Sequence, residues 1–185
     1  MMSPVSDNLL ATYLASVLLI AAVIDMRIQR IPNLLTFPAA ALALFYHCLT
    51  NGVSGLVFSI TGMATGLVLL FIPYLLGGMG AGDAKLMGVV GGIIGAKGVF
   101  FAFLFTALAG GVYALALILF YRRRFEGFFK KAYETLLALI LTRKYIPEPA
   151  DKNKTTPRLC YGLAIAFGTG TYIVLKMTNP DFFIL

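Results

Sequence analysis

The stretch SGLVFSITGMATGLVLLFIPYLL, residues 54–76, carries no charged side chain and runs directly into the glycine-rich stretch GGMGAGDAK, residues 77–85. An uncharged apolar run of about 20 residues is what a helix needs to cross the hydrocarbon core of a bilayer. Glycines then interrupt the helix, because they permit backbone conformations that a helix does not use. The stretch therefore predicts a membrane-spanning helix that ends at a short junction carrying Asp83 and Lys85.

The composition of the whole chain also indicates a lipid environment. Of its 185 residues, 59% are hydrophobic and only 12% are charged, and the mean hydropathy is +0.88. Soluble domains average about 45–50% apolar and about 25% charged residues. The basic residues behind the net charge of +7 cluster in a few loops between apolar runs. That distribution is typical of membrane-protein loops, so no nucleic-acid partner is predicted, whereas membrane lipid is.

Further apolar runs extend this prediction to a bundle of six transmembrane helices in one all-α domain, residues 1–185. The predicted spans are residues 9–24, 34–49, 54–76, 84–96, 98–121 and 159–175. The fourth is the shortest, at about 20 Å as a helix. Residues 122–158 form a predicted cytoplasmic loop. Within it the apolar residues 133–141 are too few to span the membrane and indicate a short interfacial helix.

The positions of the basic residues predict the orientation, because Lys and Arg favour the cytoplasmic side of short loops. With six crossings and the N-terminus outside, all fifteen Lys and Arg residues face the cytoplasm except Lys97 and Lys176. The sequence thus predicts a multi-pass protein of the cell (inner) membrane with both termini outside. Residues 1–8 carry no Lys or Arg, so the first apolar run is predicted to be retained as a helix and not removed as a signal peptide.

Two of the eight acidic residues stand at junctions between a long apolar span and a short loop. They are Asp25 and Asp83, and the predicted topology places both at the cytoplasmic membrane edge. Two close carboxylates share a proton, so one can activate water while the other donates a proton to a peptide carbonyl. This chemistry hydrolyses peptides without a covalent intermediate. Asp25 and Asp83 are therefore the candidate catalytic pair, and no metal or organic cofactor is implied.

The residues around the two aspartates form a recognisable combination of motifs. Residues 80–85 read GAGDAK, a GxGDxK pattern after the third span, and residues 25–33 read DMRIQRIPN after the first. The combination resembles the type IV prepilin peptidases, a family of intramembrane aspartic proteases. The resemblance covers most of the chain, including the opening of the last span at residues 161–164, YGLA.

The resemblance implies that Asp25 and Asp83 are catalytic and that the substrates are prepilins or pseudopilins, cut at the cytoplasmic face after a short basic leader. The residues implied to bind substrate or shape the site are Gly80, Gly82, Lys85, Pro32 and Asn33. Long members of the family carry a cytoplasmic domain with paired CxxC motifs between the first two spans and also N-methylate the product. Residues 25–33 leave no room for that domain, so the chain resembles the short Flp/Tad-type form and methyl transfer is not carried over.

Other interpretations of the same residues stay open from the sequence. Asp25 fits an interfacial acid paired with Arg27 or Arg30, and Asp83 fits a helix N-cap with Lys85 as a membrane-surface anchor. A small ion- or proton-coupled transporter would also use membrane acids, although such sites lie near the bilayer midplane, in many cases between repeated halves. A non-catalytic factor for pilus or secretion assembly is the remaining alternative.

Overall fold

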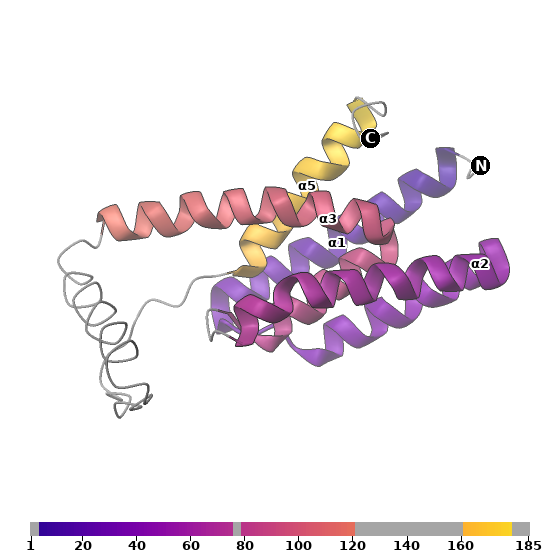
Figure 1. Ribbon diagram of the computed structural model, residues 1–185, viewed down its shortest axis with the longest axis horizontal. Coiled ribbons are helices and arrows are strands. Elements are labelled where there is room, and N and C mark those ends of the chain that lie inside the picture. Colours follow the sequence, from indigo (N-terminus) through magenta and orange to yellow (C-terminus); the bar gives the residue numbers. More distant parts are fainter. Residues whose placement is uncertain (1–3, 76–78, 121–160, 179–185) are drawn as a thin grey trace, which may run out of the picture. The chain divides into compact units, whose positions relative to one another are not determined.

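The computed structural model describes residues 4–75, 79–120 and 161–178, and every regular element in these ranges is an α-helix. The helices are α1 (Pro4–Ile28), α2 (Asn33–Leu75), α3 (Ala81–Phe120) and α5 (Tyr161–Thr178) (Figure 1). Within these described ranges, three stretches are long and apolar enough to cross a membrane, namely Leu9–Ile28, Asn33–Leu75 and Ala81–Ala116. The predicted all-α membrane-protein class is confirmed for these ranges, whereas the predicted interfacial helix at residues 133–141 lies outside them.

The chain divides into two compact units. Met1–Gly110 together with Leu159–Leu185 forms the first, and Gly111–Arg158 forms the second. The first unit contains α1, α2, α5 and the part of α3 up to Gly110, and it holds every predicted site residue. Of the second unit, the structure describes only the last turns of α3, so the prediction of a single domain over residues 1–185 stays a prediction.

Single glycines divide the two long helices into shorter segments. As a straight helix the 43 residues of α2 would be about 64 Å long, roughly twice the hydrocarbon thickness of a bilayer. Gly52 interrupts α2 with φ 58° and ψ −138°, and Gly95 interrupts α3 with φ 79° and ψ 173°. Glycine reaches such positive φ values at little steric cost. The two segments of α2 consequently lie side by side (Figure 1). Residues of both segments line one pocket.

Side chains of α2 satisfy the backbone carbonyls beside the interruption at Gly95. Ser59 Oγ donates to the carbonyl oxygen of Gly92 at 2.8 Å, and His47 Nε2 lies 3.3 Å from that of Ile93. Both side chains are buried. An unsatisfied carbonyl in hydrocarbon costs several kcal/mol, so these contacts stabilise the break and hold the first segment of α3 against α2.

The second segment of α2 packs on the first segment of α3 with backbone against backbone. A Cβ atom at Gly62 would collide with the carbonyl group of Gly91, and one at Gly91 would collide with that of Gly62. A Cβ atom at Gly66 would collide with the carbonyl group of Met87 in the same way. Small residues are what allows membrane helices to approach this closely.

Gly62→Ala is expected to lower the stability of the protein, because the new methyl group must separate the two helices. Overpacking of this kind costs about 1–3 kcal/mol, which thermal unfolding in detergent would record as a lower midpoint. Gly111→Ala is the matched control, since a Cβ atom there meets nothing within 4 Å. Equal unfolding midpoints for the two variants would contradict the proposed contact.

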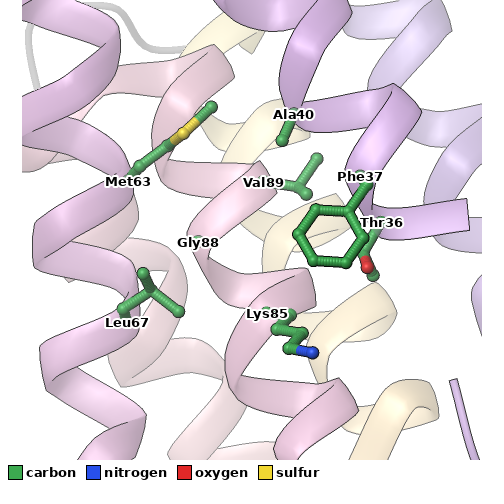
Figure 2. A pocket seen from close by; sticks show the side chains of 8 residues that line it. All are labelled: Thr36, Phe37, Ala40, Met63, Leu67, Lys85, Gly88 and Val89. Carbon is green, nitrogen blue, oxygen red and sulfur yellow. The ribbon is translucent and has the colours of Figure 1, made fainter. Parts of the chain in front are cut away.

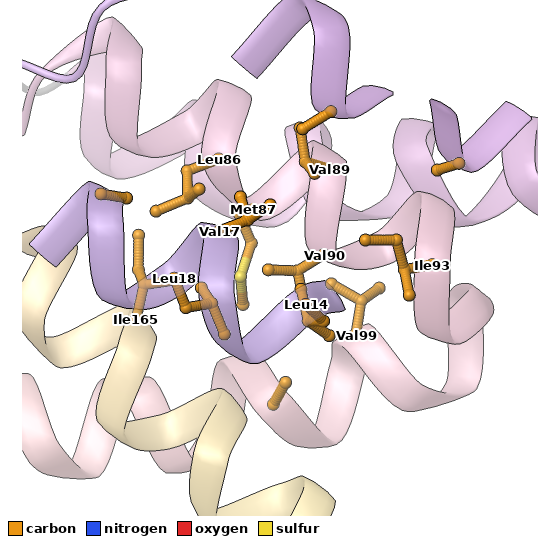
Figure 3. Close-up of a cluster of buried hydrophobic side chains, with 14 of the residues drawn as sticks. Leu14, Val17, Leu18, Leu86, Met87, Val89, Val90, Ile93, Val99 and Ile165 are labelled. Atoms are coloured by element: carbon orange, nitrogen blue, oxygen red, sulfur yellow. The ribbon is translucent and has the colours of Figure 1, made fainter. Parts of the chain in front are cut away.

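Buried apolar side chains fix how α1, α3 and α5 meet. Leu14 of α1, Met87 and Val90 of α3 and Ile165 of α5 are each fully buried in one cluster (Figure 3). Burial of such side chains contributes about 1.5–3 kcal/mol each. The cluster thereby places the first residues of α3 and α5 beside the last turn of α1, and these three helix ends build the candidate site.

Candidate active site

Asp25 lies in the last turn of α1 and is only 5% exposed. The helix ends because Gln29 has a left-handed backbone, with φ 53°, and donates its N–H to the carbonyl oxygen of Asp25 at 2.9 Å. This is a common helix termination. Arg27 and Arg30, the ion-pair partners that the sequence offered, are exposed. A buried carboxylate beside exposed arginines does not fit a simple interfacial acid.

The hydrogen-bond partner of the Asp25 side chain comes from α5. Its Oδ2 accepts the N–H of Gly162 at 2.9 Å. Gly162 is the second residue of α5, where backbone N–H groups have no partner within the helix. The start of a helix carries partial positive charge and favours a carboxylate, whereas the C-terminal end of α1 disfavours one. α5 therefore stabilises an anion where α1 alone would not.

Gly162 also provides the space that Asp25 occupies. A Cβ atom at position 162 would lie 2.9 Å from Oδ2, 3.0 Å from Cβ and 3.1 Å from Cγ of Asp25. Only glycine leaves room for this contact without a shift of the carboxylate or of the helix. The sequence predicts residues 161–164 at the opening of the last span but assigns no role to Gly162. The small residue at that opening is the one local feature of the sequence that could have indicated a close contact there.

Asp83 is the third residue of α3 and is 8% exposed. Its Oδ2 accepts the N–H of Gly80 at 3.0 Å, and its own N–H donates to the carbonyl oxygen of Gly80 at 3.1 Å. Gly80 thus occupies the N-cap position, and Asp83 supplies the return bond of a capping box from the third helical position. The alternative of Asp83 as the N-cap residue is therefore wrong.

The two carboxylates come together where α1 ends and where α3 and α5 begin. Each carboxylate is held by a backbone N–H at a helix start, Asp83 by that of Gly80 and Asp25 by that of Gly162. Gly82 brings the two motif-bearing turns into contact, since a Cβ atom there would lie 3.0 Å from both Cβ and the carbonyl oxygen of Ile31. Two buried carboxylates at one end of a helix bundle are the groups that an aspartic protease uses, one as acid and one as base.

Lys85 and Asn33 form a second link between the same two turns. Lys85 Nζ donates to Asn33 Oδ1 at 2.8 Å. Lys85 is two residues beyond Asp83, so the helical period places it on nearly the opposite face of α3. The ammonium group consequently braces the start of α2 and does not lie between the aspartates.

The other predicted shaping residues have separate positions. Gly80 caps α3, Gly82 contacts Ile31, and the carbonyl oxygen of Pro32 accepts the N–H groups of Leu35 and Thr36 in the first turn of α2. All of them lie in the two turns that surround the aspartates. The structure therefore gathers the seven predicted residues at one end of the first unit and adds Gly162 to them.

Comparison with known proteins gives two matches. Residues 12–115 match the sequence model of the type IV leader peptidase family. The chain is also 36% identical over 112 residues to the prepilin leader peptidase/N-methyltransferase of Bacillus subtilis (strain 168). That alignment covers 59% of this chain and 44% of the relative, so the chain spans less than half the length of the relative. No solved structure matches the chain.

Proposed function

Since the chain belongs to the type IV leader peptidase family, we propose that it is a membrane aspartic endopeptidase that removes the leader peptide of prepilins or pseudopilins. The single observation that carries this proposal is the pair formed by Asp25 and Asp83. Both are buried, they come from different helices, and each accepts a backbone N–H at a helix start. The relative that matches the chain is named for leader-peptide cleavage.

The proposed mechanism uses the two carboxylates as one unit with a shared proton. The ionised member takes a proton from water as the water oxygen attacks the carbonyl carbon of the scissile peptide bond. The protonated member donates its proton to the carbonyl oxygen, which gives a neutral tetrahedral intermediate. The proton taken from water then passes to the leaving nitrogen as the C–N bond breaks. A hydroxyl group of the intermediate returns a proton to the other carboxylate, which restores the shared proton of the pair. Because Oδ2 of each aspartate binds a backbone N–H, we assign the Oδ1 atoms to water and substrate.

Methyl transfer is not part of the proposal. The relative carries N-methyltransferase in its name, but the alignment covers only 44% of that protein. In this chain, residues 29–32 alone separate α1 from α2. The proposal therefore concerns peptide hydrolysis.

We further propose six membrane crossings, both termini outside and the aspartates at the cytoplasmic face of the cell membrane. The interruption at Gly52 falls between the predicted second and third spans, and that at Gly95 falls at the end of the predicted fourth. The distribution of basic residues supports the orientation. Two interrupted long helices supply four crossings, and α1 and α5 supply the other two.

The topology predicts opposite accessibility for two single cysteines. In a chain whose Cys48 and Cys160 are replaced by serine, Asn51→Cys should react with a membrane-impermeant maleimide added to intact cells. Thr155→Cys should react only after the membrane is permeabilised. Asn51 is exposed next to the interruption at Gly52. Labelling of Thr155→Cys in intact cells would contradict the three crossings proposed between the two positions, and with them the cytoplasmic site.

The function itself is tested by co-expression with prepilin genes that lie near this gene in its genome. Leader removal appears on a gel as a smaller product, and mass spectrometry gives the new N-terminus. We expect cleavage that depends on the wild-type protein. An intact prepilin beside a folded, membrane-inserted protein would oppose the peptidase and favour a transporter or an assembly factor.

A further inference from the structure

A pocket of about 180 Å³ opens on the face of α3 that carries Lys85 and not Asp83 (Figure 2). Both segments of α2 contribute to its walls. Among its lining residues are Phe37 and Ala40 from the first segment of α2, Met63 and Leu67 from the second, and Lys85 and Val89 from α3. We refer to these residues as the α2/α3 groove. The mechanism proposed above uses none of them.

Lys85 provides the charge of the groove and lies at one end of it. Figure 2 shows Lys85 at one end and Ala40 and Met63 at the other. Lys85 belongs to the second turn of α3, which starts at the aspartate site, so the charged end lies at the membrane edge of the proposed topology. The apolar end extends along the helices toward the bilayer interior. A cation at the surface above an apolar slot matches the layout of an anionic phospholipid.

The side chain of Lys85 is held in place by two contacts, and its ammonium group keeps N–H donors for a ligand. A lysine carries three N–H donors. One goes to Asn33 Oδ1 at 2.8 Å, and Nζ lies 5.2 Å from the ring centroid of Phe37, which restrains the side chain. The remaining two donors suit the oxygens of a phosphate group. Phe37 and Leu67, at 61% and 42% exposed, leave the groove open to a molecule from the surrounding bilayer.

We propose that the α2/α3 groove binds an anionic phospholipid, with an acyl chain between the two segments of α2 and the phosphate on Lys85. The charge complementarity at one end and the apolar walls at the other argue for a lipid as the occupant. Because Lys85 also binds Asn33, an occupied groove braces the contact between the turns on which both aspartates are mounted. The proposal does not depend on the identity of the peptide substrate.

The chain contains no tryptophan, so a single introduced tryptophan reports on its own surroundings. Leu67→Trp places the reporter in the groove. Val68→Trp is the matched control, because Val68 is the next residue, at nearly the same depth, 66% exposed and outside the groove lining. The full chain is reconstituted into vesicles of brominated phosphatidylglycerol mixed with unlabelled phosphatidylcholine, and into the converse mixture, and fluorescence quenching is measured.

We expect the Leu67→Trp reporter to prefer phosphatidylglycerol over phosphatidylcholine by about fivefold, the effect of one lysine near anionic headgroups. The Val68→Trp reporter should show no preference. Adding Lys85→Gln to Leu67→Trp should remove the preference. Raising the salt concentration to about 1 M, where the screening length is about 3 Å, should weaken it in the chain that keeps Lys85, which tests the charge without a variant that alters folding.

Three outcomes would overturn the proposal. Equal preference at positions 67 and 68 would indicate ordinary lipid around the protein. A preference that survives both Lys85→Gln and high salt would remove the role of Lys85. Relief of quenching by an added apolar membrane-spanning peptide, with no preference among lipids, would assign the groove to a protein helix instead.

Discussion

Asp25→Asn and Asp83→Asn are each expected to abolish leader-peptide cleavage while the protein still inserts and folds. Asparagine keeps the shape of aspartate and can accept the N–H of Gly162 or Gly80, but its amide does not exchange a proton with water or substrate. Loss of an acid or base that acts in a concerted unit lowers the rate by about 10³-fold or more. The measurement is cleavage of a co-expressed prepilin, followed by rates on purified protein in detergent.

The same chemical change has a control on the same helix. Asp7→Asn alters an acid at the opposite end of α1 and should leave the rate unchanged. The double variant Asp25→Asn/Asp83→Asn should be no slower than either single variant, because residues that act as one unit are not additive. A single variant that keeps a tenth of the wild-type rate would exclude the two-aspartate mechanism.

Gly162→Ala is expected to lower the cleavage rate by about 10–100-fold, mainly through kcat. The methyl group would lie within 2.9–3.1 Å of three side-chain atoms of Asp25, so the carboxylate or the start of α5 must shift. A displacement of about 1 Å at a catalytic group can cost about a hundredfold in rate. Substrate binding elsewhere on the protein should change little, so KM should stay near its wild-type value.

Gly170→Ala separates this geometric effect from a general effect of alanine in α5. Position 170 lies on the same helix, and a Cβ atom there meets nothing within 4 Å, so its rate should equal that of the wild type. Thermal unfolding of both variants shows whether the fold is retained. A folded Gly162→Ala protein with wild-type kcat would remove Gly162 from the site and weaken the assignment of Asp25 Oδ2.

The sequence predicted the helical membrane class because that information is local. An apolar run such as residues 54–76 indicates a lipid environment by its composition alone, and a helix satisfies its own backbone hydrogen bonds in lipid. The role of Asp83 in its helix was predicted incorrectly, although its hydrogen bonds with Gly80 are also local. The sequence offered it as an N-cap before a helix starting at Ala84, whereas α3 begins three residues earlier, at Ala81, and Gly80 occupies the N-cap position. A helix boundary depends on which residue caps the first turn, and the apolar pattern of the sequence does not record that choice.

The α-helical membrane class and the two junction aspartates in GxGD and IPN contexts follow from the sequence. Only the folded bundle shows that α5 supplies the N–H for Asp25, across 137 residues of sequence, and that Lys85 of α3 donates to Asn33 of α2. Helical periodicity and hydropathy depend on neighbours within a few turns. A carboxylate meets the start of a distant helix only once side chains such as Leu14, Met87 and Ile165 have packed, and that packing is a property of the whole bundle.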